Sequence, residues 1–316
     1  MAGLREITES EGTAPGALAL AGALALPTPP GVRASVRDLL RGGSVPRYRP
    51  ERWNGDFQVQ SNNNCYNYAC DIRNNTYAQP GMGAGLPHAS IDCPGETTGA
   101  IADGLLSTGA VEGSAGIEFG HHVALVIAPN RDFHWYRHDR DGTWSHKPGG
   151  TEATNLDDSD HPITDPRQAN RGIYTVFCGF FCVPRGGVRL AGYLATLAAV
   201  DRTDDRTVVR LLVFSGRPDP EWVLDPDEEA ALLAKLGAAR AGTRVTAQQS
   251  GRSRLGYRGF QIDRPGRTPG TREVTTVHGG VVSEVRTTGL DQRADDHDIE
   301  QDLLEQARAR GFGNLL

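Results

Sequence analysis

A run of short strands between residues 122 and 144 constrains the fold more than any other part of the sequence. Apolar side chains alternate along 122–128, Pro129-Asn130 indicates a turn, and aromatic residues follow over 133–137. Asp141-Gly142 is a strong hairpin signal, because both residues readily adopt the positive φ angles of a tight turn. Strands joined by such short turns pair with their neighbours in opposite directions. The sequence therefore predicts an antiparallel meander.

Two short helices are expected before this meander. Three asparagines at 62–64 are good N-cap residues, which places Cys65 in the first turn of a helix. A second helix is expected over 98–107, with Gly109 as its stop signal. A buried strand over 172–183 completes this set of elements, and the predicted fold class is α+β.

The chain has 316 residues, which at roughly 100–200 residues per domain indicates two domains. We expect a flexible leader over 1–48, a first domain over 49–185 and a smaller α+β accessory domain over 186–316. The Pro-Arg-Gly-Gly sequence at 184–187 is the boundary signal. In the accessory domain the patterns indicate, in order, a strand over 207–215, a helix started by a capping box at 225–228, strands over 255–262 and 274–285, and an amphipathic helix over 298–310.

Composition argues against several kinds of partner and location. A net charge of -6 with dispersed acidic residues does not fit binding to nucleic acid or to an anionic membrane. The apolar stretch 17–26 is shorter than the about 20 residues that cross a bilayer, and it lacks the positive leading segment of a secretory signal. Five cysteines, an odd number, do not describe a disulfide scaffold. These features together favour a cytoplasmic location.

Cys65 and His122 are the best candidates for a nucleophilic pair. A thiol becomes a strong nucleophile when its pKa falls, and both a helix N-terminus and a neighbouring imidazolium favour the thiolate. Cys65 has the first of these, and His122, at the head of an alternating strand, is the expected source of the second. The cysteines Cys70, Cys178 and Cys182 are expected to be structural.

A cysteine that opens a helix, a second helix, and then His-Val-Ala-Leu-Val-Ile on a strand resemble the NlpC-type and CHAP-type branches of papain-like cysteine amidases and peptidases. The resemblance covers residues from about 50 to 185. It departs from the family pattern at Asn64, where Asp or Gln is usual, and at Tyr66, where Trp or Ser is usual. It implies a papain-like first domain, in which the helix that bears the cysteine packs on an antiparallel sheet.

The resemblance also implies roles for individual residues. Cys65 corresponds to the nucleophile and His122 to the general base. His134, on the following strand, stands where a polar residue orients the base, and His138 takes this role if the hairpin between the strands is tight. Gln60, upstream of the cysteine, is a candidate donor to the oxyanion.

These inferences together predict a thiol-dependent amidase or peptidase that acts through an acyl-enzyme on Cys65 and needs no cofactor. Its substrate would be a peptide or an amide, and the accessory domain would bind a protein partner. Neither a nucleic acid nor a membrane is an expected partner.

Two alternatives to this enzyme stay open. One is a non-catalytic binding or structural module on a papain-like frame. The other is a zinc hydrolase, although no Cys-x-x-Cys or His-Glu-x-x-His motif is present and no metal ligand is assigned. The candidate ligands for zinc are clustered histidines, namely His121, His122, His134, His138 and His146.

Overall fold

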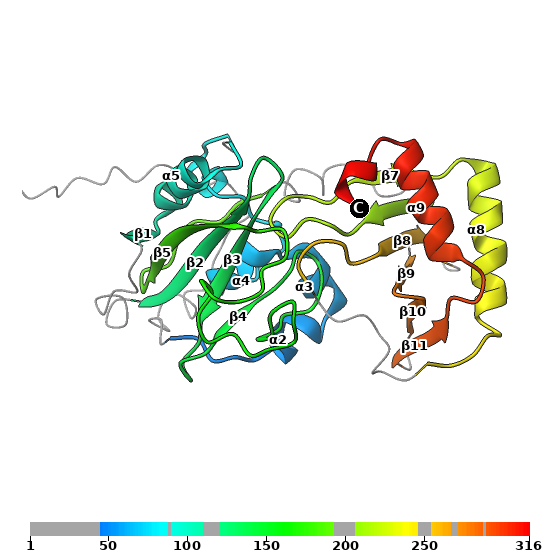
Figure 1. The fold of residues 1–316 in the computed structure, drawn as a ribbon, viewed down its shortest axis with the longest axis horizontal. Coiled ribbons are helices and arrows are strands. Elements are labelled where there is room, and N and C mark those ends of the chain that lie inside the picture. Colours follow the sequence, from blue (N-terminus) through cyan, green and yellow to red (C-terminus); the bar gives the residue numbers. More distant parts are fainter. Residues whose placement is uncertain are drawn as a thin grey trace, which may run out of the picture. The chain divides into compact units, whose positions relative to one another are not determined.

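Two antiparallel β-sheets and a small number of helices make up the part of the chain that the structure describes (Figure 1). The architecture is mixed α and β, and the antiparallel pairing expected from the turn signals is confirmed. Among the described residues, no helix combines the length and the apolar character needed to span a bilayer. The structure is a computed structural model, and it describes residues 45–87, 90–109, 120–192, 206–245, 254–266, 271–286 and 289–316.

Most of the predicted leader lies outside the described residues, which include only 45–48 of it. The division between two domains at residue 185 stays a prediction.

The first sheet has the strand order β1-β5-β2-β3-β4. Its central hairpin, β2 with β3, pairs Val123 with Arg137 across a tight turn. Continued by one residue, this register sets His122 opposite His138, which is the tighter of the two arrangements considered from the sequence. The strands are β1 (Leu106–Gly109), β2 (Gly120–Ala128), β3 (Asp132–His138), β4 (Trp144–His146) and β5 (Val176–Pro184).

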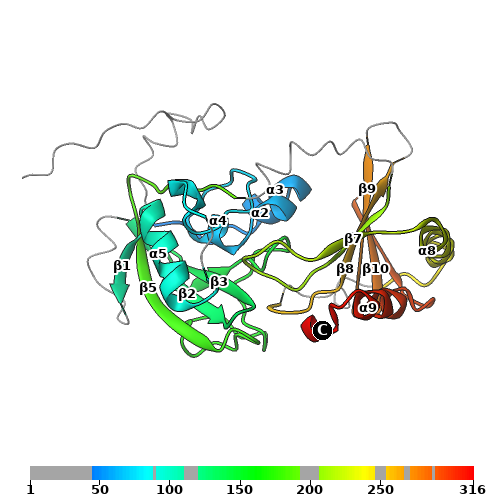
Figure 2. The same cartoon turned by 90° about the horizontal axis from the view of Figure 1, so that it is seen from above.

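Each face of the first sheet has its own hydrophobic core. Val123, Leu125 and Ile127 of β2 share one core with residues of helices α4 (Cys65–Ala69) and α5 (Cys93–Asp103). Figure 2 shows both helices beside the strands of this sheet. Since successive side chains of a strand point to opposite faces, the residues between these three face the other core. That second core contains Ala124, Val126, Tyr136, Trp144, Tyr174 and Phe180.

Helix α5 begins and ends earlier in the sequence than expected. Asp92 caps it, and Gly104, with a φ of 112°, ends it in the left-handed conformation that glycine adopts at little cost. The residues after Gly104 form strand β1, so the predicted helix over 98–107 is wrong at its C-terminal end. The remaining short helices are α2 (Glu51–Asn54), α3 (Phe57–Asn62), η1 (Met82–Ala84) and η2 (Gly313–Leu315).

The second sheet has the strand order β11-β10-β9-β8-β6-β7. Helices α8 (Pro226–Ala239) and α9 (Ile299–Ala309) both contribute buried residues to its core. The predicted capping box is confirmed, because the side chain of Asp225 accepts from the backbone N–H of Glu228 and the side chain of Glu228 accepts from the backbone N–H of Asp225. The strands are β6 (Val208–Leu211), β7 (Glu221–Val223), β8 (Phe260–Pro265), β9 (Arg272–His278), β10 (Val281–Arg286) and β11 (Gly289–Ala294).

A disulfide between Cys93 and Cys178 joins α5 to β5, with the two Cα atoms 5.3 Å apart. The two cysteines are 85 positions apart in the sequence, so only the folded chain brings them together. The odd number of cysteines, which argued against a disulfide scaffold, thus gave no sign of this single disulfide. Cys65, Cys70 and Cys182 lie outside this disulfide and are buried.

Candidate functional site

Cys65 is the first residue of α4, as the asparagine run predicted. The side chain of Asn64 caps this helix by accepting from the backbone N–H groups of Tyr66 and Asn67. The amide group of Asn64 also donates to the carbonyl oxygens of Ala78 and Gly216, each at 2.7 Å. The cap is therefore held from both sides, and it fixes the position of the Cys65 backbone.

The Cys65 side chain is fully buried, with no exposed surface. Its Sγ lies 3.9 Å from the carbonyl oxygen of Phe133, to which the thiol donates. Burial raises the pKa of the thiol well above its usual value, and the charge of Asp132 raises it further. The chemical environment therefore keeps the thiol protonated, whereas a nucleophilic cysteine needs the thiolate.

His122 lies on the other face of the first sheet. Cys65 shares its core with Val123, whereas His122 points with Ala124 to the opposite face. The His122 ring is buried there, and its centroid is 6.4 Å from that of His138. The structure thus brings His122 to one candidate orienting residue, but it does not bring His122 to the thiol of Cys65.

His134 belongs instead to a buried chain of hydrogen bonds with a fixed direction. The carbonyl oxygen of Leu156 can only accept, so His146 donates to it from Nε2 over 2.9 Å. Burial lowers the pKa of His146 to about 4, and the neutral ring accepts at Nδ1 from His134 Nε2 over 2.8 Å. His134 is neutral for the same reason, so its Nδ1 accepts from the hydroxyl of Ser215 over 2.6 Å.

Ser215 belongs to the segment 213–217, between β6 and β7. The predicted strand over 207–215 is too long, because β6 ends at Leu211, and no site residue was expected in this segment. The buried carboxylate of Asp132 accepts the backbone N–H groups of Ser215, Gly216 and Arg217 and the hydroxyl of Tyr174. Burial raises the pKa of Asp132, and these four donors counteract that rise. The segment 213–217 therefore provides hydrogen-bond donors that offset the cost of burying the Asp132 carboxylate.

Gln60 contributes a backbone atom to the site and not the side-chain donor that was expected. The buried Nζ of Lys147 donates to the carbonyl oxygens of Gln60, Asn63 and Gly149, at 2.5, 2.6 and 2.7 Å. Two of these carbonyls lie at the C-terminal end of α3, where free carbonyl groups favour a cation. Burial lowers the pKa of Lys147 well below its usual value. Lys147 thus ties α3 to the end of β4.

A second buried cation, Arg137, is also fully engaged. It forms ion pairs with Asp139 at 2.8 Å and with Asp71 at 3.1 Å, and its guanidinium lies 4.1 Å from the ring centroid of Tyr68. The hydroxyl of Tyr68 is 2.7 Å from that of Ser145, which in turn donates to Asp139. These contacts connect α4 to β3 and β4 through buried polar groups that bond one another.

The histidines do not assemble into a metal site in the described part of the chain. No group of three or more His, Cys, Asp or Glu side chains is placed there to hold a metal ion. The Nε2 of His121 lies 2.7 Å from the carbonyl oxygen of Ala69, on the face of the sheet that carries α4. His134 and His146 face the other way and bond each other. The zinc hydrolase alternative therefore finds no ligand set among the described residues.

Comparison with known proteins gives one informative match. The chain is 49% identical over 144 residues to insoluble matrix shell protein 1 of Ruditapes philippinarum, a match that spans 45% of this chain and 93% of that protein. No protein family model matches the chain. No solved structure matches it either.

This match corrects three expectations from the sequence. The interpretation as an NlpC-type or CHAP-type enzyme is wrong, because the matching relative is named as an insoluble matrix shell protein and not as a peptidase. No family model supports a peptidase either. The description of the chain as a cysteine hydrolase is wrong on the same finding. The cytoplasmic location is also wrong, since it does not fit a relative of that kind.

Proposed function

Because the chain belongs to the family of insoluble matrix shell protein 1 of Ruditapes philippinarum, we propose that it is a non-catalytic structural component of an insoluble extracellular matrix. The matching region covers 45% of the chain. We extend the proposed structural role to the rest of the chain. The alternative of a structural module, considered from the sequence, agrees better with this family than an enzyme does.

The observation that carries the proposal is the separation of the reactive groups. The thiol of Cys65 is buried in the core shared with α4 and α5, and its pKa is raised. The imidazole of His122 lies on the opposite face of the sheet. A thiol and an imidazole in these positions cannot form a thiolate–imidazolium pair without unfolding of the sheet between them. This arrangement supports a structural role.

The disulfide between Cys93 and Cys178 gives independent support. Disulfides form and persist in oxidising environments, which include the extracellular space, and they are rare in the cytosol. A matrix outside the cell would expose the chain to such conditions for long periods. The covalent link between α5 and β5 would persist under these oxidising conditions and would stabilise the folded chain.

Thiol labelling tests the absence of a reactive cysteine. The folded full-length chain is treated with iodoacetamide at neutral pH, and the modified cysteines are identified by mass spectrometry. We expect no modification of Cys65, Cys70 or Cys182 until concentrated urea is added, because all three are buried. Rapid labelling of the native chain that disappears in a Cys65→Ala variant would contradict the proposal.

Extraction tests the association with a matrix. The extracellular material of the tissue that makes the chain is washed with salt, then with urea, and then with urea and a reductant. We expect the chain to remain in the pellet after the salt wash. Recovery of the chain in the salt-soluble cell lysate alone would overturn the proposal.

A further inference from the structure

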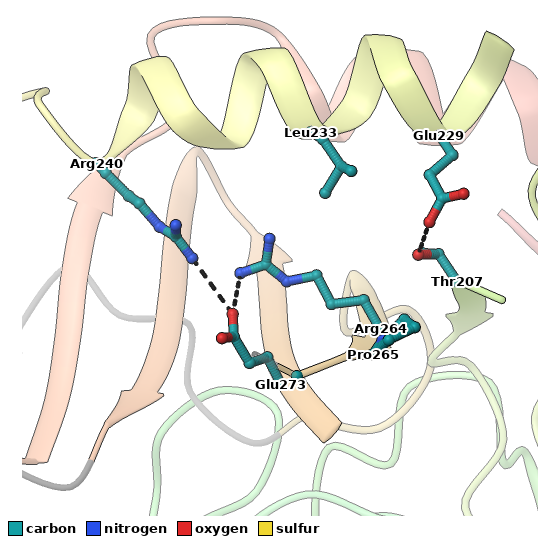
Figure 3. A pocket seen from close by; sticks show the side chains of 8 residues that line it. Thr207, Glu229, Leu233, Arg240, Arg264, Pro265 and Glu273 are labelled. Carbon is teal, nitrogen blue, oxygen red and sulfur yellow. Dashed lines mark hydrogen bonds and ion pairs between the residues drawn. The ribbon is translucent and has the colours of Figure 1, made fainter. Parts of the chain in front are cut away.

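A hollow of about 310 Å³ lies between helix α8 and strands β8 and β9 of the second sheet (Figure 3). Its volume is at the lower end of the roughly 300–1,000 Å³ typical of small-molecule sites, which corresponds to a ligand of one or two small rings. The side chains that line it include Thr207, Glu229, Leu233, Arg240, Arg264 and Glu273.

At one end of the hollow, two arginines form a network of ion pairs with two glutamates. Arg240 bonds Glu284 through two nitrogens at 2.9 to 3.1 Å, and Arg264 bonds Glu273 at 2.6 Å. Glu273 also lies 3.5 Å from Arg240, and Glu284 lies 3.4 Å from Arg264. Each cation therefore faces two anions, and the network holds the guanidinium groups in fixed positions.

The opposite end carries an acceptor, and the middle is apolar. The hydroxyl of Thr207 donates to the carboxylate of Glu229, which keeps further lone pairs for other donors. Leu233 lies between the two polar ends in Figure 3, and its side chain is 38% exposed. A large apolar side chain that is exposed inside a polar hollow is available to contact the apolar part of a ligand.

Arg264 adds a buried donor to this arrangement. Its Nε–H is buried and donates to no group in the described part of the chain. A buried donor without an acceptor is costly, and native structures rarely keep one unless a ligand or water completes it. Arg264 lines the hollow, so a small rotation of its side chain would bring this donor to an acceptor on a ligand there.

The charges of the lining decide the class of ligand. The guanidinium groups of Arg240 and Arg264 are already balanced by Glu273 and Glu284, so these positive charges do not favour an anionic ligand. The lining offers fixed N–H donors and carboxylate acceptors around one apolar side chain. Hydroxyl groups both donate and accept, so a ring that carries several hydroxyls and an apolar face complements this pattern.

We propose that this hollow binds a neutral sugar. Arg264 and Glu229 would bond hydroxyl groups at the two ends of the sugar, and Leu233 would contact the apolar face of its ring. The proposal goes beyond the structural role proposed above and does not depend on it. A chain that fails to bind sugar could still belong to an insoluble matrix.

Saturation-transfer NMR with cellobiose and the full-length chain tests this proposal. We expect transfer from the protein to cellobiose, and weaker transfer to sodium glucuronate and to glucosamine at the same concentration. Leu233→Asp should weaken the binding of cellobiose by roughly tenfold, which corresponds to about 1.4 kcal/mol. Leu233→Trp should strengthen it, because a larger flat surface then faces the ring. Arg264→Lys, which keeps the charge and removes Nε, should weaken it.

Ile101→Asp is the matched control, since Ile101 is 48% exposed on a different helix, α5, and it should leave the binding unchanged. Circular dichroism establishes that each variant is folded. The proposal is overturned by an absence of transfer to cellobiose, by equal effects of the Leu233→Asp and Ile101→Asp substitutions, or by stronger binding of the charged sugars.

Discussion

The imidazole of His134 donates from Nε2 to Nδ1 of His146, and the two nitrogens lie 2.8 Å apart in the core of the first sheet. The carbonyl oxygen of Leu156 fixes the direction of this bond, because it can only accept from His146. The hydroxyl of Ser215 completes the chain at the other end. His146 must be neutral to accept at Nδ1 while it donates from Nε2, which makes the native state sensitive to acid.

We predict that the contribution of His146 to the free energy of unfolding falls as the pH drops below about 6.5. Its pKa is lowered from 6.5 to about 4 by burial, so below pH 6.5 the unfolded chain binds more protons than the folded chain. The contribution of His146 is fully present above pH 6.5 and is lost as the pH falls through 4. At about 1.4 kcal/mol per unit, it is on the order of 3 kcal/mol. Urea unfolding across this pH range measures it.

A His146→Gln variant provides the comparison. Asp103, Asp158 and Asp219, with pKa values raised to about 6, contribute in the opposite direction, but they do so equally in both proteins. We expect the free energy of unfolding of the variant to depend less on pH between about 4 and 6.5. An unchanged slope would show that His146 is not held neutral in the core.

Gly216→Ala should destabilise the protein by about 1–3 kcal/mol, the usual cost of overpacking. A Cβ at this position would come within 2.3 Å of the ring of Phe133, and the segment 213–217 cannot move away without loss of its bonds to Asp132. Gly186→Ala is the control, because nothing lies within 4 Å of its Cβ position. Thermal unfolding of both variants measures the difference, and equal melting temperatures would contradict the tight contact.

Reduction of the disulfide between Cys93 and Cys178 should cost about 2–5 kcal/mol of stability. The link closes a long loop of the unfolded chain and so lowers the entropy of that state. Thermal unfolding with and without dithiothreitol measures the effect on the native sequence. A double Cys93→Ala, Cys178→Ala variant should melt near the reduced protein and should not respond to the reductant. A response of the double variant would mean that dithiothreitol acts elsewhere.

Lys147→Met should destabilise the protein by about 3–5 kcal/mol, because three carbonyl groups lose the ammonium group that donates to them. Lys235→Met is the matched control. Lys235 forms an ion pair with Asp302 on a partly exposed surface, where such pairs contribute about 0–1 kcal/mol. Denaturation with urea compares the two variants. Similar losses in both would mean that burial of Lys147 does not matter for stability.

Local signals in the sequence predicted the elements that depend on local contacts. The Pro129-Asn130 turn set the register of β2 and β3, Asn64 began α4, and the capping box at Asp225 began α8. Each of these signals acts between residues close together in the chain, through turn geometry or through a side chain that satisfies nearby N–H groups.

The contacts of the site could not be predicted in this way. The alternation of β2 correctly separated His122 from Val123, but it gave no indication that α4 lies on the side of Val123. The partner of His134 is Ser215, 81 positions away, and Lys147 reaches Gln60 across 87 positions. Such pairings follow from tertiary packing, which no local pattern encodes. The papain-like interpretation rested on the order of the elements and not on which face each helix covers.

The bonds of the segment 213–217 have a consequence for how the chain acquires its fold. Asp132 and its partner Ser215 are 83 positions apart in the sequence, and Asn64 and its partner Gly216 are 152 positions apart. Contacts between such distant positions form slowly. The chain loses the entropy of closing a large loop before the contact contributes any favourable free energy. The polar interior of the first sheet can therefore reach its final order only after synthesis has passed residue 217.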